Sequence, residues 1–277
     1  QNVTITGMSS GSVYLTKYDN CSGLEWVAKG VPLTPNGTIT CTSMNVGTSS
    51  GFVMMTGRYS GQVTFTSAVT PALTSVCASS STISGAGIYI AIYDYSGCLK
   101  SVQTILNNAT YTHVSSHITQ SRALFPTGTQ NRVHVAINET TTTANKVQVF
   151  AFVVNASGFL SGAWTAPISS SGTAVVNDIG SFKNTVAVTG TFQRDVAWNT
   201  SPIFASGATG VNEAIVLSLN EVAAISQPNS IAMLTKGFDH DLGTSTSSGT
   251  GVNVFSSNDI VMTGFYTGTP ASTFGTT

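Results

Sequence analysis

Short segments in which apolar and polar residues alternate recur along the chain. This two-residue period, together with many aromatic and β-branched side chains, is typical of a β-strand with one buried face. A cluster of Asp, Asn, Ser and Gly follows most of these segments and favours a tight turn before the next apolar stretch. The pattern therefore predicts a series of β-hairpins. They cover residues 13–28, 88–103, 147–164 and 214–226.

The last of these hairpins is the least clearly marked. Residues 213–224 also have the composition of a helix, but their β-branched centre favours a strand. No other segment has the period of an amphipathic helix, so the pattern predicts an all-β protein.

A second element alternates with the hairpins. It is an apolar strand that ends in Thr-Gly and is followed two residues later by an aromatic side chain. We expect the glycine to allow a β-bulge or a close backbone approach where the strand leaves its sheet, and the aromatic ring to fold back onto the core. Copies end at Gly57, Gly190 and Gly264, with a partial copy at Gly7 and a degenerate one, lacking Thr-Gly, at residues 133–137.

Two alternating elements repeated along one chain indicate a stacked or radial array. Residues 13–19 (VYLTKYD), with Gly23 and Trp26, and residues 52–61 (FVMMTGRYSG) resemble the SBBP-like β-propeller repeats of bacterial and viral surface proteins. The resemblance implies a β-propeller. Because that family is defined by its repeat and fold, it implies no catalytic residues.

We therefore expect one domain over residues 1–277, a β-propeller of four or five blades. The chain opens and closes on the same type of strand, so the N- and C-terminal strands are expected to close the ring. Uneven spacing between the Thr-Gly copies leaves the blade number open. The alternative is a β-sandwich or jelly roll, whose strands have similar spacing but need no repeat.

The charge content is unusually low. Only 8% of the residues are Asp, Glu, Lys or Arg and the net charge is -1, whereas about a quarter of the residues are charged in an average protein. Such a surface repels its own copies weakly, which favours self-association. The few basic residues form no stripe for a nucleic-acid backbone, and no apolar run is long enough to span a membrane.

Cysteines and sequons favour an extracellular, cell-surface or virion location. The spacing of the four cysteines fits no zinc site. Their even number is compatible with two disulfides, for which three pairings are open. The alternative is four free, buried thiols. The candidates are Cys21, Cys41, Cys77 and Cys98. Glycosylation sequons begin at Asn2, Asn20, Asn36, Asn108, Asn138, Asn155 and Asn199, of which Asn20 and Asn155 lie in predicted turns.

Metal-binding patterns are sparse. Asp239 and Asp241 flank a histidine in a predicted loop, where their carboxylates are candidate ligands for calcium or simply a solvated turn. His113 and His117 have a metal-ligand spacing only on a helix; on a strand they lie roughly 13 Å apart. We expect no other cofactor.

These features predict a non-catalytic structural or interaction module whose partners are its own copies, other surface proteins or glycans. No nucleophile elbow, phosphate loop or convergent carboxylate pair is present. The alternative is a carbohydrate-binding propeller that uses aromatic rings in bends and loops, with a glycoside hydrolase as a third hypothesis. The rings in question are Tyr59, Tyr95, Tyr111, Phe192 and Tyr266.

Overall fold

The computed structural model confirms an all-β protein over the residues it describes. These are 11–21, 23–47, 51–70, 77–107, 111–121, 130–140, 145–170, 172–183, 185–193, 196–198, 201–204, 213–220, 232–234, 246–255 and 259–267. In this part of the chain, every strand pair whose register is defined is antiparallel. The same residues contain no helix that could cross a bilayer. The chain divides into two compact units: Gln1–His113 with Val154–Leu160, and Val114–Val153 with Ser161–Thr277.

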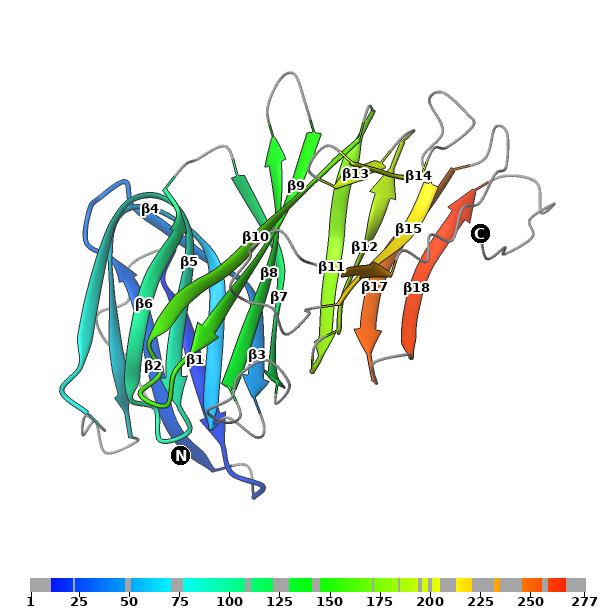
Figure 1. The fold of residues 1–277 in the computed structure, drawn as a ribbon. Helices are drawn as coiled ribbons and strands as arrows, with labels where there is room; N and C mark the ends of the chain where they lie inside the picture. The colour runs from blue at the N-terminus through cyan, green and yellow to red at the C-terminus, as the bar shows by residue number, and fades with distance from the viewer. Residues whose placement is uncertain are drawn as a thin grey trace. The chain divides into compact units, whose positions relative to one another are not determined.

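Unit 1 is built on one six-stranded sheet with the order β1-β2-β4-β5-β6, in which β3 also pairs with β4 (Figure 1). Its long strands β4 and β5 pair without a break from Phe52–Asp94 to Thr66–Ser80. The strands are β1 (Val13–Tyr18), β2 (Leu24–Pro32), β3 (Thr38–Gly47), β4 (Phe52–Val69), β5 (Ser80–Asp94) and β6 (Leu99–Leu106).

Two facing glycines mark the point where this long ribbon changes its neighbours. Gly61 and Gly85 pair with each other and have φ angles of 76° and 114°, a region that residues with a Cβ rarely adopt. Before Gly61, β4 pairs with β3; after it, β4 pairs with β2. The glycine pair thus allows one ribbon to serve two neighbours.

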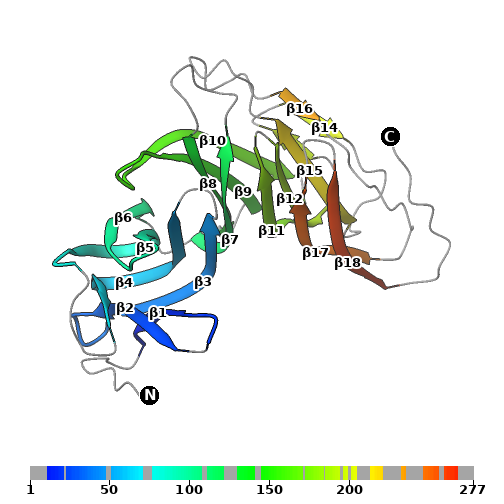
Figure 2. The same ribbon diagram turned by 90° about the horizontal axis from the view of Figure 1, so that it is seen from below.

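All six strands of unit 1 contribute to one core, and they gather side by side in both views (Figures 1 and 2). Alternate residues of β4 point into it, as the two-residue period predicts. The ring of Phe65 lies 5.0 Å from that of Tyr89, centroid to centroid. Each fully buried side chain of this size contributes about 2 kcal/mol through loss of apolar surface from water. The β4 members are Val53, Met55, Tyr59, Val63, Phe65 and Ala68.

Unit 2 contains three sheets, with the orders β14-β13-β10-β9-β8-β7, β11-β12-β15-β16 and β17-β18. The strands of the first are β7 (Tyr111–Ser121), β8 (Gln130–Thr140), β9 (Asn145–Val154), β10 (Leu160–Ser170), β13 (Val196–Trp198) and β14 (Ser201–Phe204). Those of the others are β11 (Ala174–Phe182), β12 (Thr185–Phe192), β15 (Glu213–Asn220), β16 (Ala232–Leu234), β17 (Thr246–Val254) and β18 (Ile260–Thr267).

The sheet of β11 and β12 is buried on both faces. Val186 and Val188 of β12 pack with residues of the β7–β10 sheet, whereas the intervening Ala187 packs with Val252 and Val254 of β17. Apolar residues at consecutive positions of β12 follow from this burial. The segment at 213–220, ambiguous by composition, is strand β15, and it pairs with β12 along its whole length.

Candidate functional site

The Thr-Gly element produces a defined local geometry in β4. Gly57 pairs with Cys41, but Thr56 pairs with Ser43, so Thr42 is an extra residue in β3. This is a β-bulge directly opposite the glycine. A Cβ on Gly57 would overlap the carbonyl oxygen of Thr40, which explains why only glycine fits here.

The other two complete copies have the same geometry. In β11, opposite Thr189-Gly190, the extra residue is Asn177; in β17, opposite Thr263-Gly264, it is Thr250. A Cβ on either glycine would overlap a backbone carbonyl of the bulged strand, as at Gly57. The expected role of the glycine, close approach of the backbone at a bulge, is confirmed in all three copies.

In the β12 copy the chain leaves its sheet after this element, as expected. β12 ends at Phe192, and the next strand, β13, pairs with β10 of a different sheet. In unit 1 the strand β4 stays in its sheet: beyond Gly61 it pairs with β2 in place of β3, and both belong to the same sheet. The aromatic side chains that follow the two glycines, Tyr59 and Phe192, are both buried. Their predicted packing onto the core is confirmed, so neither ring is available to stack on a sugar.

Polar side chains connect the bulges of unit 2 to neighbouring strands. The Asn177 side chain donates from Nδ2 to the carbonyl oxygen of Gly249 at 2.7 Å, and Oδ2 of Asp178 accepts from the amide of Val252 at 2.9 Å. Asn138 pairs its side-chain amide with both backbone groups of Val176, each at 2.9 Å. Backbone groups freed by a bulge are thus satisfied by side chains of the adjacent strand.

The three hairpin turns that the structure describes share one hydrogen-bond pattern. Oδ1 of Asp19, Asp94 and Asn155 accepts from the backbone amides two and four residues further on, at distances of 2.7–3.0 Å. These are Asx turns. Gly97 and Gly158, with φ angles of 89° and 84°, complete two of them. The predicted turn chemistry is confirmed at these positions.

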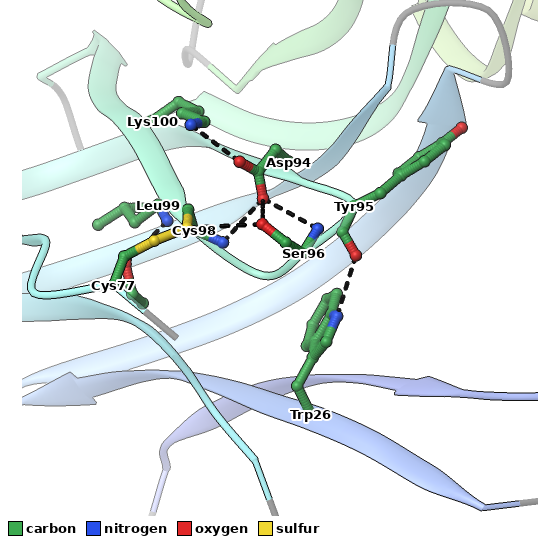
Figure 3. Close-up of a disulfide and its surroundings, with 9 residues drawn as sticks. Trp26, Cys77, Asp94, Tyr95, Ser96, Cys98, Leu99 and Lys100 are labelled. Atoms are coloured by element: carbon green, nitrogen blue, oxygen red, sulfur yellow. Dashed lines mark hydrogen bonds and ion pairs between the residues drawn. A yellow bond between two sulfur atoms is a disulfide. The ribbon is translucent and has the colours of Figure 1, made fainter. Parts of the chain in front are cut away.

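The Asp94 turn also carries the disulfide (Figure 3). Cys98 is bonded to Cys77, and Lys100 forms an ion pair with Asp94 at 2.8 Å. Burial would raise the pKa of Asp94, but hydrogen bonds from Lys100, Ser96 and the Cys98 amide, with the Lys100 charge, hold that pKa below its ordinary value. These contacts fix the end of the β5–β6 hairpin.

The same turn is attached to the first hairpin of the chain. The indole Nε1 of Trp26 donates to the carbonyl oxygen of Tyr95 at 3.1 Å, as Figure 3 shows, and Lys17 Nζ donates to the same oxygen at 3.3 Å. The Tyr95 hydroxyl donates to the Gly47 carbonyl at 2.9 Å. Tyr95 therefore contributes to the packing of unit 1.

The expectation of two disulfides requires a correction, because Cys21 and Cys41 are free and exposed. Cys21 lies in the β1–β2 turn, whereas Cys41 lies beside the bulge of β3; each sulfur hydrogen-bonds to a nearby oxygen, of Asn20 and of Ser43. Local burial of the sulfur raises the pKa of the Cys41 thiol, although backbone hydrogen bonds oppose this shift.

The sequons differ in what their asparagine side chains do. Asn20, Asn36 and Asn155 are exposed. Nδ2 of Asn138, the atom that would carry a glycan, instead donates to Val176 O. Asn2, Asn108 and Asn199 lie outside the described residues.

The candidate metal ligands are not brought together in the described part of the chain. Asp239 and Asp241 lie outside it, and His113 and His117 lie on the single strand β7. Among the described residues no group of three or more His, Cys, Asp or Glu side chains could hold a metal ion. Of the other acids, Asp178 accepts from backbone amides at β17 and within its own strand.

Several large apolar side chains on strands and turns are exposed. Tyr111 is half-buried, and the side chain of Tyr266 lies outside the described set. The large apolar side chains that are exposed among the described residues are others, which the sequence analysis did not single out as binding residues. They are Tyr14, Tyr18, Leu33, Met44, Val46, Phe159, Phe255, Val261 and Phe265.

The bulged strands β3, β11 and β17 were not predicted as part of the repeat. The sequence nevertheless contains a shared feature that marks these three strands. A threonine stands four residues before each extra residue, at Thr38, Thr173 and Thr246.

A scan against protein-family models and a search of the curated proteins found no match to this chain. The repeated bulge, the Asx turn and the exposed apolar side chains are therefore the observations from which function is argued.

Proposed function

We propose that the chain is a non-catalytic structural or interaction module of an extracellular or virion surface assembly, with a β-propeller of four or five blades as its scaffold and its own copies as partners. The observation that carries this proposal is a surface that combines little charge with exposed apolar side chains. Met44 and Val46 of β3 are 53% and 43% exposed, and Val261 and Phe265 of β18 are 52% and 58% exposed.

Such a surface favours association for two reasons. Covering apolar side chains removes them from water, which is worth about 25 cal/mol per Å². Bringing copies together costs little electrostatic repulsion when the net charge is only -1. Exposed apolar groups gathered on a surface are also common at protein–protein interaction sites.

The environment follows from the cysteine chemistry. Disulfides persist in oxidising compartments and are rare in the cytosol. The Cys77–Cys98 bond supports an extracellular or virion-surface location. Rigid Asx turns and bulges at repeated positions suit a scaffold that displays a surface.

The test is the mass of the protein in solution as a function of concentration, measured by size exclusion with light scattering. We expect mass to rise with concentration. Met44→Glu/Val46→Glu should shift the midpoint of this rise at least tenfold towards higher concentration. The control, Thr38→Glu/Thr40→Glu, adds the same charge to exposed positions of the same strand and should shift it less than threefold.

A protein that stays monomeric at every concentration and turns over a substrate would overturn the proposal. A monomer that binds on a glycan array would instead support the carbohydrate-binding alternative. Repeating the array with and without calcium tests the Asp239 and Asp241 pair.

A further inference from the structure

Asn36 and Gly37 form the only Asn-Gly dipeptide in the sequence. They lie in the connection between β2 and β3, in a tight turn that the Gly37 amide closes by donating to the carbonyl oxygen of Thr34 at 2.9 Å. Proline at the second position of this turn and glycine at the fourth are typical of its type. The turn therefore holds the Asn36 backbone at the surface, between two strands of unit 1.

The Asn36 side chain differs from those of most other asparagines in what it contacts. It is exposed and makes no hydrogen bond within the described part of the chain. Five other asparagine side chains are bound to backbone groups, so they cannot rotate freely. These are Asn107, Asn138, Asn155, Asn177 and Asn253.

Glycine after the asparagine leaves the next backbone nitrogen accessible. No side chain on residue 37 stands between the Gly37 nitrogen and the Cγ atom of Asn36. The hydrogen bond from this nitrogen to Thr34 must open before the nitrogen can react. A short exposed turn opens at a low free-energy cost compared with a paired strand.

We propose that Asn36 is a site of spontaneous deamidation, and that its conversion to isoaspartate loosens the start of β3. The Gly37 nitrogen loses its proton to hydroxide and attacks Cγ of Asn36, the side-chain nitrogen leaves as ammonia, and a cyclic succinimide forms. Water then opens the ring at either carbonyl, which gives aspartate or isoaspartate. Overall, an amide and water become a carboxylate and ammonium, without oxidation or reduction.

The effect on β3 follows from the close packing of the turn. A Cβ on Gly61 of β4 would overlap the side-chain oxygen of Thr34 and would lie 3.0 Å from the Cα atom of Gly37. β3 begins at the next residue, where Thr38 pairs with Ser60 and their hydroxyl oxygens are 2.9 Å apart. Isoaspartate routes the backbone through one additional carbon atom, so the turn cannot keep both this close approach and this register.

Both products also change the charge of the surface. Each adds one negative charge to a chain whose net charge is only -1. The modification itself takes place within a single chain, so it does not require the association proposed above.

The experiment uses protein from a bacterial host, because a glycan on the same side-chain nitrogen would block the reaction. The protein is incubated at mildly alkaline pH, and peptide mapping with mass spectrometry measures aspartate and isoaspartate at each asparagine. The matched control is the Ala156→Gly variant. It places a second Asn-Gly dipeptide in an exposed turn, but there Oδ1 of Asn155 accepts from two backbone amides.

We expect Asn36 to convert at least tenfold faster than Asn155 does in the Ala156→Gly variant, with isoaspartate as the main product. Equal rates at the two positions would overturn the proposal, because the free side chain would then have no influence. Slower conversion of Asn36 would overturn it as well.

Hydrogen exchange tests the effect on β3. Backbone amides of residues 38–41 should exchange faster in the converted protein than in fresh protein. Asn36→Gln incubated in the same way should show no change, because glutamine forms its cyclic imide far more slowly. Identical exchange in fresh and converted protein would overturn the loosening of β3. Both readouts are made on individual chains, so their failure is distinct from a failure of the protein to associate.

Discussion

The Thr-Gly strands β4 and β18 have the same sequence signature and the same bulge opposite the glycine, yet their surroundings differ. β4 has partners on both edges, and Val53, Met54 and Met55 are buried. β18 has one partner among the described residues, and Val261 and Phe265 are more than half exposed. The local sequence therefore determines the backbone geometry of the bulge, whereas burial depends on which strand lies alongside.

The largest expected effect separates two hairpin strands of unit 1, the buried strand β5 and the more exposed strand β1. Tyr89→Ala should lower the free energy of unfolding by about 4 kcal/mol, because it removes a fully buried aromatic ring and the hydrogen bond from its hydroxyl to Thr40. Tyr14→Ala is the matched variant. Because the side chain of Tyr14 is 60% exposed, its loss should lower the free energy of unfolding by no more than about 0.5 kcal/mol. Both values come from urea unfolding followed by circular dichroism.

The glycines test the shared geometry directly. Gly57→Ala should cost about 3 kcal/mol, because the new methyl group meets a backbone carbonyl between two paired strands. Gly264→Ala meets the equivalent carbonyl, but β18 has no second strand partner in the described part of the chain and can shift there, so about half that loss is expected. Gly162→Ala, where a Cβ meets nothing within 4 Å, is the control and should change stability by less than about 0.5 kcal/mol. Equal losses at Gly57 and Gly162 would contradict the bulge argument.

Much of this architecture could be predicted from sequence because it depends on short-range chemistry. The hairpins, their Asx turns and the glycine at the bulge are determined by residues within a few positions of one another, such as Asp94 and Cys98. Strand character over Glu213–Asn220 followed from its β-branched centre.

The remaining features depend on contacts between distant residues. The pairing of Cys77 with Cys98, and the free state of Cys21 and Cys41, follow from where β3 and the turns lie in the fold. The change of partner at Gly61 requires β2 and β3 to approach the same strand. Neither the cysteine pairing nor this change of partner has a signature within a few residues of sequence. The candidate calcium ligands Asp239 and Asp241 remain a prediction.

A smaller effect distinguishes the bulges themselves. Asn177, the extra residue of β11, connects its strand to β17 through Gly249 and Ser248, whereas the extra residue of β3, Thr42, is exposed. Asn177→Ala should therefore cost about 1.5 kcal/mol, since it leaves the Gly249 carbonyl without this donor. Thr42→Ala should cost less than about 0.5 kcal/mol. Equal losses in denaturant unfolding would show that the side-chain link to β17 contributes no stability.

The smallest effect concerns the charged turn at Asp94. Its pKa is held below the ordinary value, so the folded state is stabilised by the ionised carboxylate. This contribution is complete above the unfolded-state pKa of about 3.9 and is lost as the pH falls through the lower folded-state pKa. Lys100→Met removes the ion pair, which should lower stability at pH 7 by at most about 1 kcal/mol and flatten its fall below about pH 4.

The control for this experiment is Lys183→Met, an exposed lysine in a turn of unit 2, which should leave the pH profile unchanged. The Asn155 turn explains why the effect is small. It accepts the same two backbone hydrogen bonds as Asp94 without an ionisable group, so the turn forms without charge, and the carboxylate adds its attraction to Lys100 and the hydrogen bond from the Ser96 hydroxyl. If both lysine variants follow the wild-type profile from pH 7 to pH 2, the Asp94–Lys100 pair contributes nothing to stability and the two turns are energetically equivalent.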